Sequence, residues 1–382
     1  HGMGEKKYKR IVVKVGSSTI THSVGKLNLT MIDNIVRQLV DLKNRGKEVI
    51  LVTSGAIGAG MGELGCKKRP RLMPKQQAMA AIGQGLLIGV YNRLLREYGE
   101  KGAQILLTAS DLEDRDRYLN AFNTLVTLLE YGVIPVVNEN DTVATNEIKF
   151  GDNDTLSARV ASLAEADVLI NLSDVEGLYK GDPSKDAESL DIIRKVEQIT
   201  PEIESLAGRN KGSEVSIGGM FTKIEAAKIA VDSGIIMVIG PGYRKNIVID
   251  LVDMLEKGDE YNLGTTFVPS GGSLSKRKQW LSFNVPVCGG LKVDEGAEQA
   301  IINKGKSLLP GGVKEVVGIF SSGELVRILN QDGREIGKGL VDYSSMEIEK
   351  IKGHHSSEIF SILGYINQEE VIHRKNMVIG GC

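Results

Sequence analysis

Short apolar runs rich in valine, isoleucine and leucine alternate with longer helical stretches from residue 10 to about residue 240. Strands that are apolar throughout are typically buried on both faces, and strands separated by helices pair in parallel. We therefore predict an α/β fold with a mostly parallel sheet sandwiched by helices. The predicted strands are residues 11–15, 48–54, 103–108, 133–138, 166–173 and 235–240.

Two of the stretches between these strands have the periodicity of amphipathic helices. Residues 31–46 end at Gly46, and residues 118–132 end at Gly132. Glycine is common just beyond the last turn of a helix because it adopts the left-handed backbone conformation found there. The two glycines therefore predict where these helices stop.

The composition of the chain changes near residue 265, and residues 265–278 are rich in Ser, Gly, Pro and Lys. Such a composition is typical of a connector. Beyond it, short strands broken by SSG and QDG turns indicate a smaller, β-rich unit. We predict a first domain at residues 8–265, a linker at 266–284 and a second domain at 285–375.

The overall charge is nearly balanced, with 47 basic and 49 acidic residues among 382. A balanced surface creates no extended positive field that would attract nucleic acid or an anionic membrane. Any anionic ligand is therefore expected to meet a few local groups, and neither a membrane nor nucleic acid is an expected partner.

The start of the chain and its cysteines bear on the compartment. No apolar segment follows the first charged residues as in a signal sequence, and no run of eighteen apolar residues occurs. Cys66, Cys288 and Cys382 are far apart and lack the spacing of a disulfide framework or a zinc site. These features predict a protein of the reducing cytoplasm.

Two predicted strands run directly into glycine and small hydroxyl residues. The first carries Lys14 and continues into Gly16 and Ser17, and the second continues into Ser54. Glycine lets a backbone approach an anion, free amides point at phosphate oxygens, and a lysine neutralises them. Each segment also has a purely structural interpretation. Lys14 fits an ordinary strand end, and the small residues near Ser54 allow tight packing of a helix on the sheet.

The richest polar segment follows the strand at residues 133–138. Carboxylates and amides crowded at a strand exit can bind an ammonium group, hold a metal or orient lysines. Asp154 also stands where a helix N-cap is expected, so a solvated acidic loop with a cap is the alternative. The polar residues are Asn138, Glu139, Asn140, Asp141, Asp152, Asn153 and Asp154.

Two further segments have features of a nucleotide site. Ser173 and Asp174 follow a buried strand, although they also fit residues that simply end a strand. Gly218 and Gly219 precede a helix that carries Lys223. Glycine amides at a helix start, with a lysine one turn later, form an anion-binding arrangement. The sequence shows no serine, cysteine or histidine nucleophile paired with a base, which covalent acyl chemistry would need. Phosphoryl transfer needs no such nucleophile and is therefore favoured.

Taken together, these motifs resemble the glutamate 5-kinase branch of the amino acid kinase family, and the last part of the chain resembles its PUA domain. The resemblance extends over nearly all of residues 10–375. It implies the amino acid kinase fold plus a small β-rich PUA domain, with ATP and L-glutamate over the carboxyl ends of the strands. The motifs are VKVGSS, VTSGAI, NENDTVAT, GDNDTLSA, SDVEGLY and GGMFTK.

The resemblance also assigns roles to matching residues. It implies that Lys14, Asp154 and Lys223 are catalytic, with Asp154 orienting the two lysines. It also implies that Ser54, Asp141 and Asn153 bind glutamate. Serine at position 173 and isoleucine at 217 are mild departures from the family pattern, and the ligands of Mg²⁺ stay unassigned. The ATP contacts fall to Lys14, Gly16, Ser17, Ser173, Asp174, Ile217, Gly218, Gly219, Met220, Phe221, Thr222 and Lys223.

The expected reaction is ATP-dependent phosphorylation of the glutamate side-chain carboxylate, as the first step of proline biosynthesis. The resemblance further implies Mg²⁺, a homo-oligomer and feedback inhibition by proline. One alternative is a related kinase acting on another acceptor, such as N-acetylglutamate, aspartate, carbamate or UMP. The other is RNA binding through the PUA domain, which the 11 basic and 13 acidic residues of positions 285–382 disfavour.

Overall fold

The computed structural model describes residues 8–145, 153–181, 191–208, 219–270 and 286–380. The chain divides into two compact units, residues 1–275 and 276–382. Strand β10 (Thr265–Phe267) belongs to the sheet of the first unit, which therefore extends two residues beyond the predicted boundary at 265. The remaining domain limits stay a prediction, since residues 271–285 lie outside the described residues.

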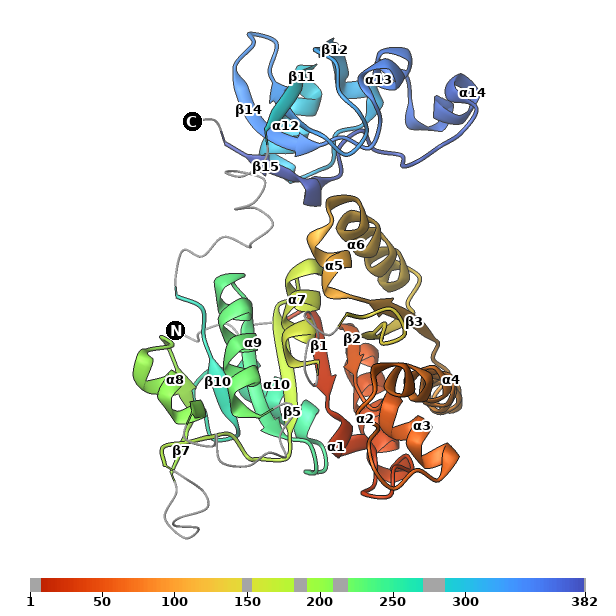
Figure 1. The fold of residues 1–382 in the computed structure, drawn as a ribbon. Helices are drawn as coiled ribbons and strands as arrows, with labels where there is room; N and C mark the ends of the chain where they lie inside the picture. The colour runs from red at the N-terminus through yellow and green to blue at the C-terminus, as the bar shows by residue number, and fades with distance from the viewer. Residues whose placement is uncertain (1–7, 146–152, 182–190, 209–218, 271–285, 381–382) are drawn as a thin grey trace. The chain divides into compact units, whose positions relative to one another are not determined.

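An eight-stranded sheet forms the centre of the first unit (Figure 1). All neighbouring strands are parallel except β9 and β10, which are antiparallel. Each of the six predicted strands is present, which confirms the mostly parallel sheet. In spatial order the strands are β3 (Gly102–Leu107), β4 (Ile134–Glu139), β2 (Glu48–Thr53), β1 (Arg10–Val15), β5 (Val168–Ser173), β9 (Ile236–Pro241), β10 and β8 (Lys195–Val196).

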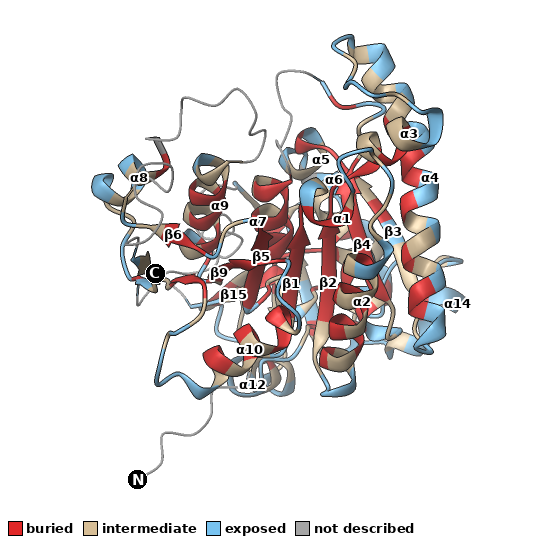
Figure 2. Ribbon diagram, turned by 90° about the horizontal axis from the view of Figure 1, so that it is seen from below, coloured by how far each residue is buried: buried red, intermediate tan, exposed pale blue. Residues whose placement is uncertain are grey.

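Helices cover both faces of this sheet, and the strands between them are buried (Figure 2). Side chains alternate along β1, so that Val12 packs into one hydrophobic core while Ile11 and Val13 pack into the other. The core containing Val12 includes α5 (Ala109–Glu113), α6 (Arg115–Glu130), α7 (Asp154–Leu163), α8 (Pro201–Gly208) and α9 (Met220–Asp232). The opposite core includes α1 (Ser17–Ile20), α2 (Leu29–Asn44), α4 (Met73–Glu97) and α10 (Ile247–Lys257).

The predicted helix ends are confirmed at two glycines. Gly46 and Gly132 follow the C-caps of α2 and α6 and have φ angles of 84° and 71°. The remaining elements of this unit are α3 (Ala56–Leu64), which precedes α4, and the short antiparallel pair β6 (Leu178–Tyr179) and β7 (Ile192–Ile193).

The second unit is built on a five-stranded sheet in the order β12 (Val313–Val317), β11 (Val287–Val293), β13 (Leu325–Leu329), β14 (Glu335–Leu340) and β15 (Met377–Ile379). Its core surrounds fully buried Tyr343. This mixed sheet confirms the predicted smaller β-rich unit. Its helical elements are α12 (Glu295–Lys304), η2 (Pro310–Gly312), α13 (Ser345–Ile351), η3 (Ser356–Glu358), α14 (Ile359–Leu363) and η4 (Arg374–Asn376).

Helix α4 is long and apolar enough to cross a membrane by length and composition alone. One of its faces, however, contributes Leu87, Tyr91, Leu94 and Leu95 to the core beside the sheet. The core helix of a globular domain passes the same composition test, so we interpret α4 as a core helix of the first unit.

Candidate active site

The parallel strands β1, β2, β4 and β5 bring their carboxyl ends to one edge of the sheet, where ligands of such folds bind. Lys14 lies on the same face of β1 as Val12 and is fully buried. Its partner in the register with β5 is Asn171, which is also fully buried. The two strands thus place an ammonium group and an amide beside each other beneath α7.

Asp154 receives both predicted lysines. Its Oδ1 lies 2.8 Å from Nζ of Lys14, and its Oδ1 and Oδ2 lie 3.3 Å and 3.2 Å from Nζ of Lys223. All three side chains are at least nine-tenths buried. The structure therefore brings together residues 14, 154 and 223, which are far apart in the sequence, as one charged cluster.

The prediction of Asp154 as an N-cap is wrong. Asp154 is the first residue of α7, and the N-cap is Asn153, which has a left-handed backbone with φ of 64° and no side-chain capping bond. The carboxylate is directed to the lysines instead of to the backbone amides of its own helix. Position 154 therefore serves the charged cluster, and α7 begins without the expected cap.

Two neutral side chains complete the contacts of Asp154. Nδ2 of Asn171 donates to Oδ1 at 2.9 Å, and the hydroxyl of Thr222 donates to Oδ2 at 2.7 Å. The resemblance placed Thr222 at the nucleotide, whereas here its hydroxyl binds Asp154. Sequence reasoning missed Asn171, although an amide within an otherwise apolar buried strand was a usable signal.

The electrostatics of this cluster follow from its burial. Burial alone would raise the pKa of Asp154, but Lys14 and Lys223, with the hydrogen bond from Thr222, hold that pKa well below its ordinary value. The carboxylate therefore stays ionised and offsets the repulsion between the two ammonium groups. Within this cluster two ammonium groups share one carboxylate, and an incoming phosphate would be attracted to these ammonium groups.

The start of α9 adds backbone donors near this charge. Gly219 is the N-cap of this thirteen-residue helix, Met220 is its first residue, and Lys223 lies one turn further. The free amides and the dipole of a helix N-terminus favour an anion. Phe221 is exposed, while Ile217 and Gly218 lie outside the described residues.

The other predicted nucleotide residues lie at the ends of β1 and β5. Gly16 and Ser17 follow β1 directly, where Gly16 is the N-cap of the short helix α1. Ser173 is the last residue of β5, and its Oγ accepts a hydrogen bond from the amide of Val175 at 3.3 Å, while Asp174 is exposed. All four residues therefore lie at the same edge of the sheet as Lys14.

Two of the predicted glutamate-binding residues are connected through the end of β2. Nδ2 of Asn153 donates to the carbonyl oxygen of Thr53 at 2.8 Å, and Ser54 is the next residue. Both Ser54 and Asn153 are buried. Asp141 follows β4 in a turn and is partly exposed at the same edge. The structure thus brings Ser54 and Asn153 together and leaves Asp141 on the adjacent strand exit.

Helices α3 and α4 approach each other unusually closely behind Ser54. A Cβ atom added to Gly83 would lie 1.6 Å from the carbonyl oxygen of Ala56, and one added to Gly60 would lie 2.0 Å from that of Met79. Only glycine fits at such distances. This close packing holds the first turn of α3 in place immediately after Ser54.

The described part of the chain contains no group of three or more His, Cys, Asp or Glu side chains that could hold a metal ion. Asp154, the most buried carboxylate of the site, is already paired with two lysines. The described residues therefore do not supply a cage made of protein ligands alone, whereas Mg²⁺ held largely by substrate phosphates is a common arrangement.

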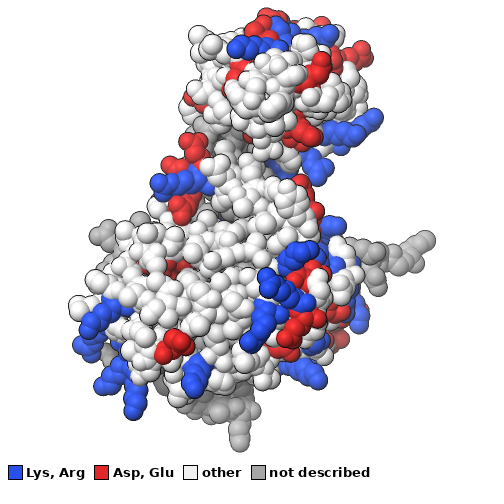
Figure 3. All heavy atoms as spheres, turned by 90° about the vertical axis from the view of Figure 1, so that its right-hand side faces the viewer, with Lys and Arg blue, Asp and Glu red and all other residues white. Residues whose placement is uncertain are grey.

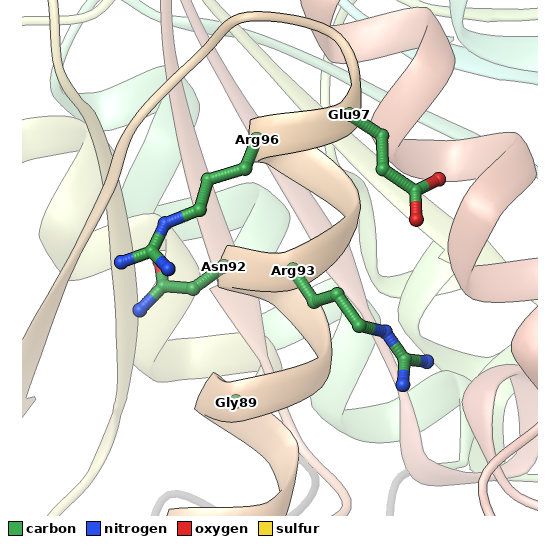
Figure 4. Close-up of a pocket in the computed structure, with 5 residues that line it drawn as sticks. All are labelled: Gly89, Asn92, Arg93, Arg96 and Glu97. Carbon is green, nitrogen blue, oxygen red and sulfur yellow. The ribbon is translucent and has the colours of Figure 1, made fainter.

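A separate hollow of about 550 Å³ lies along the later part of α4 (Figure 4). Figure 4 shows Asn92, Arg93, Arg96 and Glu97 extending from this single helix. Arg93 is nine residues beyond Gln84, the α4 residue that contacts β4, or about 13 Å along the helix axis. Among the described residues, its lining comes from α4 alone, so this hollow is not part of the charged cluster at the strand ends.

Comparison with known proteins places this chain in a family. The model of the amino acid kinase family matches residues 9–240, and that of the PUA domain matches residues 289–363. The chain therefore belongs to the amino acid kinase family.

Its relatives narrow this to one branch. The chain is 52% identical over 372 residues to the glutamate 5-kinase of Caldanaerobacter subterraneus subsp. tengcongensis, covering 97% of each chain. It is 51% identical to that of Thermoanaerobacter sp. strain X514, with the same coverage, and 48% identical to that of Moorella thermoacetica, covering 98% of this chain and 97% of the relative. This branch is the glutamate 5-kinases.

Proposed function

We propose that this chain transfers the γ-phosphoryl group of ATP to the side-chain carboxylate of L-glutamate, giving L-glutamyl 5-phosphate and ADP, as the first step of proline biosynthesis. The observation that carries the proposal is the buried cluster of Lys14, Asp154 and Lys223 at the strand ends, one residue from Asn153. The name and near full-length similarity of the relatives support the same reaction.

The chemistry requires no general base. The side-chain carboxylate is already ionised at neutral pH. One of its oxygens forms a bond to the γ-phosphorus while the bond from that phosphorus to the bridging β–γ oxygen breaks, and ADP leaves with the electron pair. The main obstacle is the approach of an anion to a polyanion.

The charged cluster addresses this obstacle. Lys14 and Lys223 would contact the phosphoryl oxygens and stabilise the charge that spreads over them in the transition state. Asp154 would keep both ammonium groups in position. Magnesium, when bound to ATP, would supply further neutralisation of the phosphates.

The amino acid would lie on the neighbouring strand exits. Ser54 follows β2, Asn153 precedes α7, and Asp141 follows β4. The carboxylate of Asp141 would pair with the substrate ammonium group, which disfavours an N-acylated amine or UMP as acceptor. This preference for a free ammonium separates the proposal from kinases that act on N-acetylglutamate or UMP. L-Aspartate also carries a free ammonium group, so only the assay separates it from L-glutamate.

The direct test is trapping of the acyl phosphate as a hydroxamate, with ATP, Mg²⁺ and in turn L-glutamate, N-acetylglutamate, L-aspartate and UMP, while ADP release is followed. We expect hydroxamate with L-glutamate and not with the other acceptors. ADP release with another acceptor in its place would overturn the substrate assignment, and no ADP release with any of them would overturn the kinase proposal.

Several accompanying properties belong to the same proposal. We expect a cytoplasmic homo-oligomer that L-proline inhibits in competition with L-glutamate. A rise in the KM for L-glutamate with added proline would test this inhibition.

For the second unit we propose a structural or regulatory role rather than RNA binding. Its acidic and basic side chains lie interspersed on the face drawn in Figure 3, and a salt-sensitive RNA complex in a filter-binding assay would contradict this.

A further inference from the structure

Three buried amide side chains form a continuous chain from α4 to the proposed glutamate site. Nδ2 of Asn153 donates to Oδ1 of Asn138 at 2.7 Å, and Nδ2 of Asn138 donates to Oε1 of Gln84 at 3.3 Å. All three residues are at least nine-tenths buried. Gln84 lies on α4, Asn138 lies on β4, and Asn153 is the N-cap of α7, so this chain of amides connects three elements.

One backbone hydrogen bond on each amide identifies which of its side-chain atoms is the oxygen and which is the nitrogen. The amide N–H of Glu139 donates to Oδ1 of Asn138 at 2.8 Å, so this atom must be the oxygen. The carbonyl oxygen of Glu139 accepts from Nε2 of Gln84 at 3.1 Å, and that of Thr53 accepts from Nδ2 of Asn153 at 2.8 Å. Since a backbone N–H only donates and a carbonyl only accepts, a flipped amide at any position would place like groups against each other.

The orientation has a consequence for Asn153. An amide nitrogen carries two hydrogens, and Asn153 uses both, one on Thr53 and one on Asn138. The remaining polar atom of the side chain is Oδ1, which can only accept. An acceptor at this position suits a substrate ammonium group, which can only donate.

We propose that Gln84 is a positioning residue for the amino acid substrate. By holding Asn138, it fixes Asn153 with its oxygen as the acceptor for the ammonium group. This inference rests on the proposed function, because it assumes L-glutamate as the acceptor. Gln84 contacts the substrate only through this chain and takes no part in the transfer of the phosphoryl group.

The test is Gln84→Met, which keeps the length of the side chain and removes both hydrogen bonds. We expect the KM for L-glutamate to rise about tenfold, equivalent to about 1.4 kcal/mol, with the KM for ATP changed less than about twofold. The kcat/KM for L-glutamate should also fall relative to that for glutarate, which lacks the ammonium group. A loss of general stability would not change this ratio.

The matched control is Gln38→Met. Gln38 is also a buried glutamine whose side chain binds backbone groups, accepting from Val248 and donating to Asn34, but it lies on α2 and contacts α10. We expect Gln38→Met to lower the melting temperature by about as much as Gln84→Met does. It should leave the KM for L-glutamate and the KM for ATP unchanged. Equal kinetic effects of the two substitutions would overturn the proposal.

A double-mutant cycle shows the route of the effect. In an Asn153→Ala background, Gln84→Met should add little further change to the KM for L-glutamate. A second tenfold rise would mean that Gln84 acts by another route and would overturn the inference. If Gln84→Met does not fold, Gln84→Asn, which shortens the amide by one methylene, should still raise this KM by about threefold, and an unchanged KM would count against the proposal.

The wild-type assay separates this inference from the proposed function. If the wild type does not phosphorylate L-glutamate, the proposed function itself fails. If the wild type is active and Gln84→Met behaves as Gln38→Met does, the function stands and only the positioning role is refuted.

Discussion

The peptide between Asn153 and Asp154 separates two differently constructed halves of the site. On one side, Asp154 gathers Lys14 and Lys223 into a cluster of full charges. On the other side, Asn153 connects to Asn138 and a chain of neutral amides. Both halves are buried, and both use side chains from the same edge of the sheet.

The difference lies in what fixes the geometry. Opposite charges attract over several ångströms in any direction, so the cluster holds its lysines mainly by Coulomb attraction. Amides interact only when donor meets acceptor, so their chain determines direction and atom type. Charge suits the stabilisation of a phosphoryl group, and directionality suits the recognition of one amino acid. Substitutions in the two halves should therefore fail in different ways.

The largest effect is expected from Asp154→Asn. Loss of the carboxylate would remove the negative charge that Lys14 and Lys223 share, so kcat should fall by two to three orders of magnitude, on the order of the loss caused by removing a preorganised charge-stabilising group. Stability should fall by about 3–5 kcal/mol, as when one partner of a buried ion pair is removed. Steady-state kinetics and urea unfolding measure the two effects, and a variant of wild-type activity would contradict the role of the cluster.

The same carboxylate predicts a pH dependence. Because the pKa of folded Asp154 is below its ordinary value of 3.8, the ionised group contributes stability that is complete above pH 3.8 and is lost as pH falls through the folded pKa. The difference in unfolding free energy between wild type and Asp154→Asn should therefore shrink below about pH 4. A difference that grows on acidification would show that the sign of the pKa shift is wrong.

The next largest effect is expected from Lys223→Ala or Lys14→Met. Each removes one cation from the proposed transition state, so kcat should fall on the order of a hundredfold. The KM for L-glutamate should change much less, because the lysines belong to the charged half. Unchanged turnover in folded variants would refute the assignment, and circular dichroism serves as the folding control.

A smaller effect is expected at the amino acid. Asp141→Asn removes the proposed partner of the ammonium group, so the KM for L-glutamate should rise about tenfold while the KM for ATP stays within about twofold. Initial rates over a grid of both substrates give the two constants. An equal rise in both would place Asp141 at the nucleotide instead.

The smallest effect is expected from Thr222→Val. This change removes one hydrogen bond to the ionised carboxylate of Asp154, of a kind worth about 1.5–3 kcal/mol to stability, and leaves both lysines in contact with that carboxylate. We expect kcat to fall by about fivefold. A loss as large as that of Lys223→Ala would mean that Thr222 contacts the nucleotide directly, as the family resemblance implied.

The sequence was sufficient to predict six of the eight strands of the sheet, but not β8 or β10, and to predict the charged residues. Mostly apolar runs such as residues 11–15 and 166–173 predict strands, and local motifs mark Lys14, Asp154 and Lys223. Asn171 was not predicted, because its contact with Asp154 depends on the pairing of β1 with β5 and on the start of α7. The contact of Gln84 with Asn138 was not predicted either. The local sequence of a helix does not indicate which amide on another element a glutamine side chain will contact.

The erroneous N-cap has a similar physical cause. Aspartate before an apolar periodic segment is a good local cap signal, but here two buried lysines compete for its carboxylate. A charge-charge contact outweighs a single capping bond, which is worth about 1 kcal/mol. Local propensity was overruled by residues far away in the sequence.

The close packing of Gly60 and Gly83 limits how this site can change over evolutionary time. A single added methyl group at either position would collide with the backbone of the opposite helix. Ala56, whose carbonyl faces Gly83, is only two residues from Ser54, so such a collision would move the proposed substrate-binding turn as well. A new acceptor specificity is therefore expected to arise by side-chain exchange at the strand exits, while the spacing of these two helices stays unchanged.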